Sequence, residues 1–326
     1  MISLVEEIGL AALFLLAFAN GANDAGKSVA SLMVPGPSGF VPRRKPLLWG
    51  GFFTGIGSLS AILISSRLFS VFTPQSLLRA TPESHFILAA LAGATLWILG
   101  ATLLRLPVSS THAIVGAIVF LAVYLFGFSG IQWDFLLVRV LLPLAAGPIA
   151  AMIGVYAFDR ATRRSGVPGK EKPGLARITH WGSGAAAAYA RGVNDAPKMA
   201  ALGAFFLLAN PSEAVWLPYT IVAVAVFLGS LVLGHRVAQT VMGKHVTMDP
   251  VQRSKAGAAT ALVVGAAAFL GAPMSTTQVH EGSNAGIGGE RKVVKSVLRG
   301  MILPWLVTLP AAGMLAISMS YLGALI

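Results

Sequence analysis

Long apolar runs separated by short polar segments form the dominant pattern of this chain. In the first half, apolar runs cover residues 4–34, 47–66, 84–104 and 135–158, and one more ends near residue 128. The second half repeats the order, with runs at residues 178–209, 214–233, 256–271 and 300–325. Runs of ~20 apolar residues are long enough to cross the hydrocarbon core of a bilayer as helices. The pattern therefore predicts an all-α polytopic membrane protein with about ten spans.

Composition and charge support the same class. Of the 326 residues, 56% are hydrophobic and 11% are charged, and the mean hydropathy is +0.76. The net charge of +12 would suit a nucleic-acid-binding protein, but the basic residues gather in short loops between apolar runs, as in cytoplasmic loops of membrane proteins. We therefore expect a multi-pass protein of the cell membrane that contacts the lipid bilayer and no nucleic acid. The absence of cysteine excludes disulfides and thiolate metal sites.

A Gly-x-Asn-Asp-Ala-x-Lys string occurs twice inside these apolar runs, at residues 21–27 and 192–198, 171 positions apart. An ionised side chain in hydrocarbon costs at least ~2.5 kcal/mol, so two matched copies favour a transport site. Because glycine weakens a helix, we expect each run to break at the motif and to free backbone carbonyls as ligands. The alternative is a buried Asp–Lys pair at i, i+3 that fixes a kink in the helix.

A second string, Pro-x-Ser-Ser/Thr-Thr, occurs at residues 107–111 and 273–277, 166 positions apart. Proline suits the first turn of a helix and serine or threonine suits its N-cap, so each string predicts a half-helix that begins inside the membrane. Such a terminus directs N–H groups and a positive dipole end to one place, and the hydroxyls would complete a cage for a tetrahedral oxyanion. Alternatively, these hydroxyls bond back to their own helices.

The charges of equivalent loops differ between the two halves. Residues 35–46 carry Arg43, Arg44 and Lys45, whereas the equivalent residues 210–215 carry only Glu213. Five crossings in each half and opposite loop polarity predict two inverted-topology repeats with broken helices, an architecture of secondary transporters. The predicted units are a first repeat at 1–158, a cytoplasmic linker at 159–177 and a second, inverted repeat at 178–326, with both termini outside.

The candidate site residues follow from the two strings. Carboxylate and amide oxygens suit a cation, either Na⁺ at Asp24 and Asp195 or a proton on these carboxyls; the predicted cation ligands are Asn23, Asp24, Asn194 and Asp195. The predicted anion ligands are Ser109, Ser110, Thr111, Ser275, Thr276, Thr277 and Gln278. Lys27 and Lys198 are assigned to charge compensation or to the anion itself.

Other polar residues are less specific. His112, equivalent in position to Gln278, is predicted to be an interhelical donor, and Glu281 is either a proton carrier or a loop-facing residue. Arg105, Arg139 and Arg191 are predicted at the ends of spans or with their charges reaching the interface.

Together, the paired Gly-x-Asn-Asp and Pro-x-Ser-[Ser/Thr]-Thr strings resemble those of the inorganic phosphate transporter (PiT) family over nearly the whole chain. The resemblance implies cation-coupled import of inorganic phosphate, no organic cofactor, Na⁺ or H⁺ as the coupling cation, and a homodimer. In the family pattern an asparagine is common at the position of Lys27, and a histidine at that of Gln278. These departures leave open phosphate or sulfate as the anion and Na⁺ or H⁺ as the cation.

Two other functional classes compete with this hypothesis. A passive anion channel would show no dependence on a cation gradient. An intramembrane hydrolase using Asp24, Asp195 and His112 has no Gly-x-Ser-x-Gly or His-Glu-x-x-His string to support it, so we expect no enzyme activity.

Overall fold

The structure, a computed structural model, describes residues 3–33, 44–164, 173–207, 211–245, 248–288 and 291–323, and these residues contain helices and no β-strand. Three short helices, α3 (Ser66–Val71), α4 (Pro74–Leu77) and α7 (Trp133–Phe135), and a π-helical segment (Leu136–Leu141) connect longer ones. The longer helices are α1 (Leu4–Val29), α2 (Arg44–Ile64), α5 (Ser84–Leu103), α6 (Ser110–Phe126), α8 (Leu142–Arg164), α9 (Pro173–Ala204), α10 (Pro211–His245), α11 (Pro250–Leu270), α12 (Thr276–Gly288) and α13 (Arg291–Gly323).

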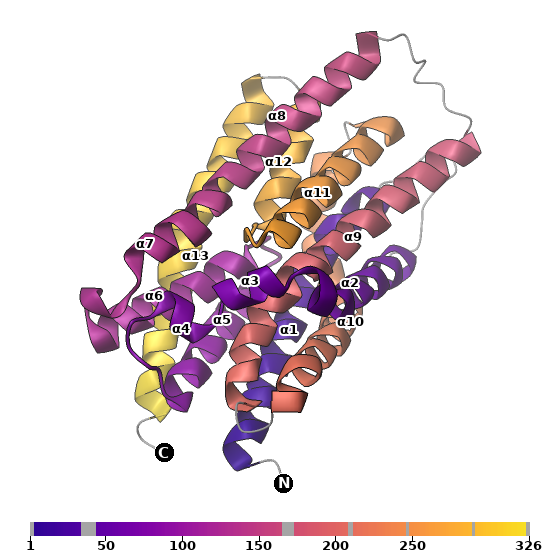
Figure 1. Cartoon of the computed structure of the whole chain (residues 1–326). Coiled ribbons are helices and arrows are strands. Elements are labelled where there is room, and N and C mark those ends of the chain that lie inside the picture. Colours follow the sequence, from indigo (N-terminus) through magenta and orange to yellow (C-terminus); the bar gives the residue numbers. More distant parts are fainter. Residues whose placement is uncertain are drawn as a thin grey trace.

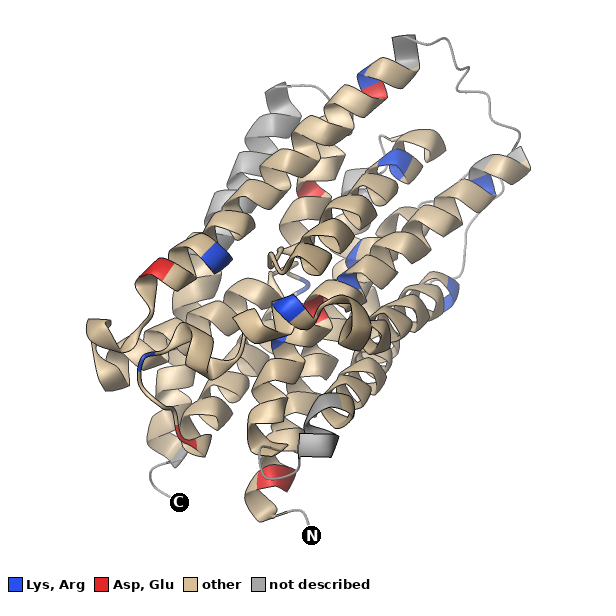
Figure 2. Cartoon of the chain, in the orientation of Figure 1, with Lys and Arg blue, Asp and Glu red and all other residues tan. Residues whose placement is uncertain are grey.

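The helices have the length and surface of membrane spans. Within the described residues, 5 helices are long and apolar enough to cross a bilayer, and two shorter apolar helices lie at Ser110–Phe126 and Leu306–Leu322. Large apolar side chains such as Leu63 and Leu262 face outward, at 82% and 73% exposure. Figure 2 shows charged residues near the helix ends and in one group at the middle of the bundle. The prediction of an all-α polytopic membrane protein is confirmed.

The two halves of the chain run in opposite directions. In Figure 1, α1 begins at the end of the molecule where both termini lie, whereas α9 begins at the opposite end, the end at which α8 finishes. The repeats are thus inverted, as the loop charges predicted. Helix α8 ends at Arg164 and helix α9 begins at Pro173. Only residues 165–172 of the predicted linker therefore lie outside the described residues. Its cytoplasmic location stays a prediction.

Each repeat packs mainly on the other. The helix α1 lies along α10, α9 along α2, α6 along α13, and α12 along α8. The motif glycines explain two of these close contacts: a Cβ on Gly21 would lie 2.1 Å from the Val226 carbonyl oxygen, and one on Gly192 would lie 2.2 Å from that of Thr54. Glycine in the Gly-x-Asn-Asp string therefore permits helix–helix approach, as small residues do in membrane interfaces.

The predicted helix breaks at the Asn-Asp motifs are wrong. Helix α1 is continuous from Leu4 to Val29, and α9 is continuous from Pro173 to Ala204 even though Pro197 lies inside it. The motif carbonyls are therefore engaged in helices. The buried Asp and Lys side chains need no unwound backbone, because segments from other helices supply their polar partners.

The breaks lie instead at the Pro-x-Ser strings, as predicted. Residues 104–109 separate α5 from α6, and residues 271–275 separate α11 from α12. Both preceding helices end in the same way: Arg105 (φ 62°) and Gly271 (φ 78°) have left-handed backbones. Each is followed by a backbone bond that closes the last turn, from Leu106 to Ala101 and from Ala272 to Ala267, each 2.8 Å.

Two of the polar segments between the predicted apolar runs contain helices. Residues 234–255, which the pattern leaves as a loop, are mostly helical, because α10 continues to His245 and α11 begins at Pro250. Polar side chains of this segment bond the end of α5: the Arg236 Nη1 donates to the Leu103 carbonyl at 3.2 Å and the Thr240 hydroxyl to that of Arg105 at 2.8 Å. Residues 67–83, between two other apolar runs, contain most of α3 and all of α4.

Candidate functional site

The half-helices α6 and α12 both begin at a capping serine. The Ser109 hydroxyl accepts from the His112 amide at 3.3 Å, and the Ser275 hydroxyl accepts from the Gln278 amide at 3.4 Å. The Ser109 hydroxyl also lies 2.7 Å from the His112 Nδ1. These two serines bond back to their own helices, which is the alternative that the sequence left open.

The two motif asparagines hold the extended segments in place. The Val108 amide donates to the Asn23 Oδ1 at 3.1 Å, and the Met274 amide donates to the Asn194 Oδ1 at 3.2 Å. Both side chains are fully buried. Each asparagine therefore fixes the Pro-x-Ser segment of its own repeat against the motif helix, a structural contact that the sequence pattern did not predict.

Three oxygens surround the ammonium group of Lys27. It donates to the Asp24 carboxylate, to the Val108 carbonyl at 2.6 Å and to the Thr277 hydroxyl at 2.7 Å. Lys27 is buried, with an exposed fraction of 4%. Since α12 belongs to the second repeat, this ammonium links both halves of the molecule.

An equivalent set surrounds the ammonium group of Lys198. It donates to the Thr111 hydroxyl at 2.7 Å, to the Met274 carbonyl at 2.9 Å and to the Asp195 carboxylate at 3.1 Å. Again the hydroxyl comes from the other repeat. The two lysine shells thus have the same composition, one carboxylate, one carbonyl and one hydroxyl each.

Other side chains complete the first of these two groups, which we call the first cluster (Asn20, Asp24, Lys27, Ser110 and Thr277). The second oxygen of Asp24 accepts from the Ser110 hydroxyl at 3.0 Å and from the Asn20 amide at 3.2 Å. Asn20 also donates to the Ser110 hydroxyl at 2.7 Å. Both carboxylate oxygens of Asp24 are therefore hydrogen-bonded.

The second cluster (Thr111, Arg191, Asn194, Asp195 and Lys198) contains a residue whose role the sequence prediction missed. Arg191 is 2% exposed, so it is neither at a span end nor reaching the interface. Its Nη2 donates to the Thr54 hydroxyl, whereas Nε and Nη1 have no hydrogen-bond partner among the described residues. The signal was present: Arg191 occupies the place of Asn20 in the repeat and lies at i−4 from Asp195, on the same helix face.

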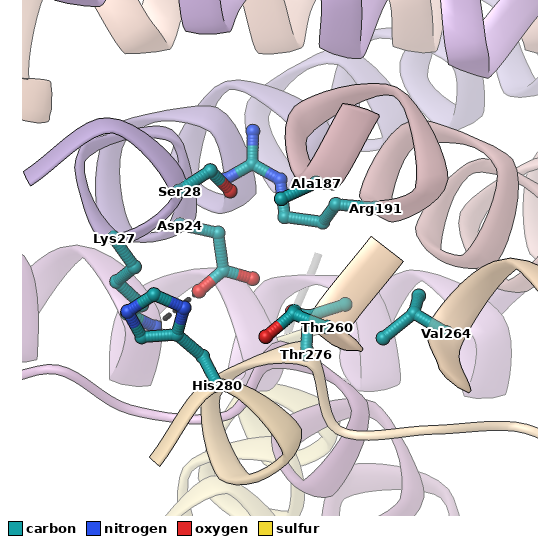
Figure 3. Close-up of a pocket in the computed structure, with 9 residues that line it drawn as sticks. All are labelled: Asp24, Lys27, Ser28, Ala187, Arg191, Thr260, Val264, Thr276 and His280. Carbon is teal, nitrogen blue, oxygen red and sulfur yellow. Dashed lines mark hydrogen bonds and ion pairs between the residues drawn. The ribbon is translucent and has the colours of Figure 1, made fainter. Parts of the chain in front are cut away.

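A small cavity lies between the repeats beside Arg191. Figure 3 shows Arg191, Asp24 and Lys27 gathered there with His280 of α12. Thr276, one of the predicted anion ligands, also lines this cavity, together with Thr260 of α11. The cavity thus brings together a guanidinium, an ammonium and hydroxyls near the start of a half-helix.

The remaining predicted residues lie on the half-helices. Gln278, in the first turn of α12, is 1% exposed, and His112 in α6 is fully buried. Glu281 lies within α12 and not in a loop, and its role as a proton carrier stays a prediction. Of the predicted site residues, the first cluster contains Asp24, Lys27, Ser110 and Thr277, and the second contains Thr111, Asn194, Asp195 and Lys198. Asn194 also holds its half-helix, as do Ser109, Ser275 and Asn23.

The charges of the two clusters do not balance. Asp24 and Asp195 oppose the three cationic side chains of Lys27, Lys198 and Arg191, all of them at most 4% exposed. In their ordinary ionisation states these groups leave one positive charge in excess. A buried excess charge is unfavourable without a counter-ion, so this arrangement favours an anion.

Inverted repeats, interlocked through broken helices around a buried polar site, define a multi-pass membrane transporter. A model of the phosphate transporter family matches residues 20–172 and 157–316, and the chain belongs to this family. A probable low-affinity inorganic phosphate transporter of Mycobacterium bovis is 29% identical over 313 residues, covering 91% of this chain and 72% of the relative. A protein of the same description from Rhizobium meliloti is 28% identical, covering 92% of this chain and 90% of the relative.

A solved structure described as a sodium-dependent phosphate transporter has the same fold. It superposes with a TM-score of 0.85 at 19% identity, covering 99% of this chain and all of the other. At this identity the likeness concerns the fold alone. The family resemblance predicted from the paired strings is confirmed, and the chain is a transporter, not an enzyme.

Proposed function

We propose that this protein imports inorganic phosphate across the cell membrane, coupled to a cation, Na⁺ or H⁺, and that it does so as a homodimer. The descriptions of its relatives support phosphate as the substrate. The resemblance to the inorganic phosphate transporter family supports the coupling and the dimer.

The observation that carries the proposal is the excess positive charge between the two repeats. Arg191 is buried and has two nitrogens whose N–H groups find no acceptor among the described residues. Arginine presents its N–H groups in a planar fork that matches the oxygens of phosphate. An anion bound there would satisfy these donors and neutralise the excess charge.

The half-helix α12 adds neutral donors at the same place. Its first residue, Thr276, lines the cavity beside Arg191, and the N-terminus of a helix attracts anions through its free N–H groups and dipole. We propose Arg191 and Thr276 as anion ligands. Ser110, Thr111 and Thr277 act through the clusters, where they bond Asp24, Lys198 and Lys27.

The direct test is uptake into proteoliposomes containing the purified full-length protein. Labelled phosphate and labelled sulfate are supplied separately, and Na⁺ and pH gradients are imposed one at a time. We expect saturable phosphate uptake that accelerates under a cation gradient and is competed weakly by sulfate.

Other outcomes identify the alternatives. Sulfate uptake exceeding phosphate uptake would make the protein a sulfate permease. Phosphate flux that follows only its own gradient would indicate a passive channel. Liposomes with Arg191→Gln serve as the negative control, and Arg139→Gln, which changes an exposed arginine of the π-helical segment, serves as the matched control.

A further inference from the structure

The positions that a coupling Na⁺ would need are occupied by the protein itself. Sodium takes oxygen ligands, and the motif oxygens predicted to bind it are those of the Asn-Asp pairs. In the first cluster, one oxygen of Asp24 accepts from Lys27 and the other from Ser110 and Asn20. Both oxygens of this carboxylate are thus engaged by donors.

The asparagine oxygens are engaged as well, because those of Asn23 and Asn194 accept the backbone amides of Val108 and Met274. In the second cluster the Asp195 Oδ2 has no hydrogen-bond partner among the described residues. One carboxylate oxygen is not a sodium site, and a sodium there would add to an existing excess of positive charge. The donor set therefore does not fit Na⁺.

The lysine shells have the composition of a cation site. Each ammonium donates to a carboxylate, to a backbone carbonyl of a Pro-x-Ser segment and to a threonine hydroxyl of the other repeat. The carbonyl and hydroxyl contacts of both lysines, and the contact of Lys198 with Asp195, are 2.6–3.1 Å long. Because these oxygens come from both repeats, a cation placed there joins the two half-helices to the motif helices.

We infer that the ammonium groups of Lys27 and Lys198 replace sodium as built-in cations, so that transport by this protein does not require Na⁺. The inference rests on the proposed function and selects between its two coupling cations: H⁺ remains and Na⁺ is excluded. The carboxylates stay neutralised throughout the cycle, because the positive charges are covalently attached to α1 and α9.

The first experiment measures phosphate uptake by full-length protein in proteoliposomes with Na⁺ replaced on both sides by K⁺ or by N-methyl-D-glucamine. We expect a rate within twofold of that in Na⁺. A tenfold or larger loss without Na⁺ would overturn the inference while leaving phosphate transport in place. Absence of phosphate uptake with every cation would instead contradict the proposed function.

A second measurement does not depend on transport. Thermal unfolding of the detergent-purified protein is followed while NaCl replaces KCl at constant ionic strength. We expect no shift in Tm for the natural chain. A saturable rise in Tm with Na⁺ would show that Na⁺ binds although both lysines are present, and would contradict the inference even if no uptake were observed.

Substitution of the lysines sharpens the test. Lys27→Ala with Lys198→Ala vacates both oxygen shells, so Na⁺ should now raise Tm and accelerate uptake at least tenfold over K⁺. The matched control, Lys27→Met with Lys198→Met, fills the same space with an uncharged chain and should show no Na⁺ effect. Equal responses of the natural chain and the alanine variant to Na⁺ would overturn the proposal.

Discussion

The two clusters share most of their positions in the repeat, but the hydrogen bonds to their carboxylates differ. In the first, Asn20 and Ser110 bond the second oxygen of Asp24. In the second, Arg191 occupies the place of Asn20 but bonds Thr54, and the Asp195 Oδ2 has no hydrogen-bond partner within the described part of the chain. The difference is that both carboxylate oxygens of Asp24 are paired within the protein, whereas one oxygen of Asp195 and two nitrogens of Arg191 have no hydrogen-bond partner among the described residues, so a ligand is more readily accommodated beside the second cluster.

The largest expected effect is on Arg191. Arg191→Gln removes charge-assisted hydrogen bonds worth about 1.5–3 kcal/mol each, so losing two should weaken phosphate binding by about 100-fold or more. The measurement is the concentration of phosphate at half-maximal uptake. Arg191→Lys keeps the positive charge without the planar guanidinium, so its phosphate concentration at half-maximal uptake should lie between those of the natural chain and of Arg191→Gln.

The equivalent change in the first repeat provides the comparison. Asn20→Ala removes a donor that bonds only protein groups, Asp24 and Ser110. It should lower Tm and leave the phosphate concentration at half-maximal uptake within twofold. If Asn20→Ala weakened phosphate binding as much as Arg191→Gln, the two clusters would have the same role and the comparison would fail.

The next largest effect is on stability. Asp24→Asn leaves the Lys27 ammonium buried without its counter-charge, which should cost about 3–5 kcal/mol, whereas Asp24→Asn with Lys27→Met should recover most of this loss. Asp195→Asn should cost less by about 1 kcal/mol or more, because Asp195 has fewer hydrogen bonds to lose. Unfolding in detergent measures all three, and equal costs for Asp24 and Asp195 would contradict the distinction.

A smaller effect separates the serines of the Pro-x-Ser strings from the threonine beside them. Ser109→Ala and Ser275→Ala each remove an N-cap and should cost about 1 kcal/mol of stability, with phosphate affinity unchanged. Thr276→Val removes the hydroxyl of a residue that lines the cavity and should weaken phosphate binding by about 3- to 10-fold, the equivalent of about 0.5–1.5 kcal/mol. A loss of phosphate affinity in the serine variants would instead support the predicted role of these serines as anion ligands.

The architecture could be predicted from the sequence because it depends on features that can be read directly from the order of the residues. The spans follow from apolar length, the inversion from loop charge, and the half-helices from Pro-x-Ser at N-caps. The placement of Asp24 near Lys27 also follows from i, i+3 spacing, and the structure confirms the pair.

The contacts between repeats could not be predicted in this way. Whether α1 breaks at Asp24 depends on which groups from elsewhere meet its side chain, and these come from Ser110 and Thr277, more than 80 positions away. Likewise, the motif glycines have their reason in the Val226 and Thr54 carbonyls of other helices. The burial of Arg191 was not predicted, because its charge suggested a position at the membrane interface. In the structure Arg191 lies in α9, and packing against α2 buries it.

The smallest expected effect compares the helix ends that precede the two half-helices. Arg105 and Gly271 both have positive φ, and a left-handed backbone costs a non-glycine residue about 1–2 kcal/mol. Arg105→Gly should stabilise the protein by about 0.5–1 kcal/mol, since the side chain is exposed and the relief of strain exceeds the entropy that glycine loses on folding. Gly271→Ala should do the opposite, because its Cβ would also lie 2.9 Å from the Arg67 Cβ. Unfolding in detergent gives both signs; a destabilising Arg105→Gly would mean that the arginine side chain itself supports the break between α5 and α6.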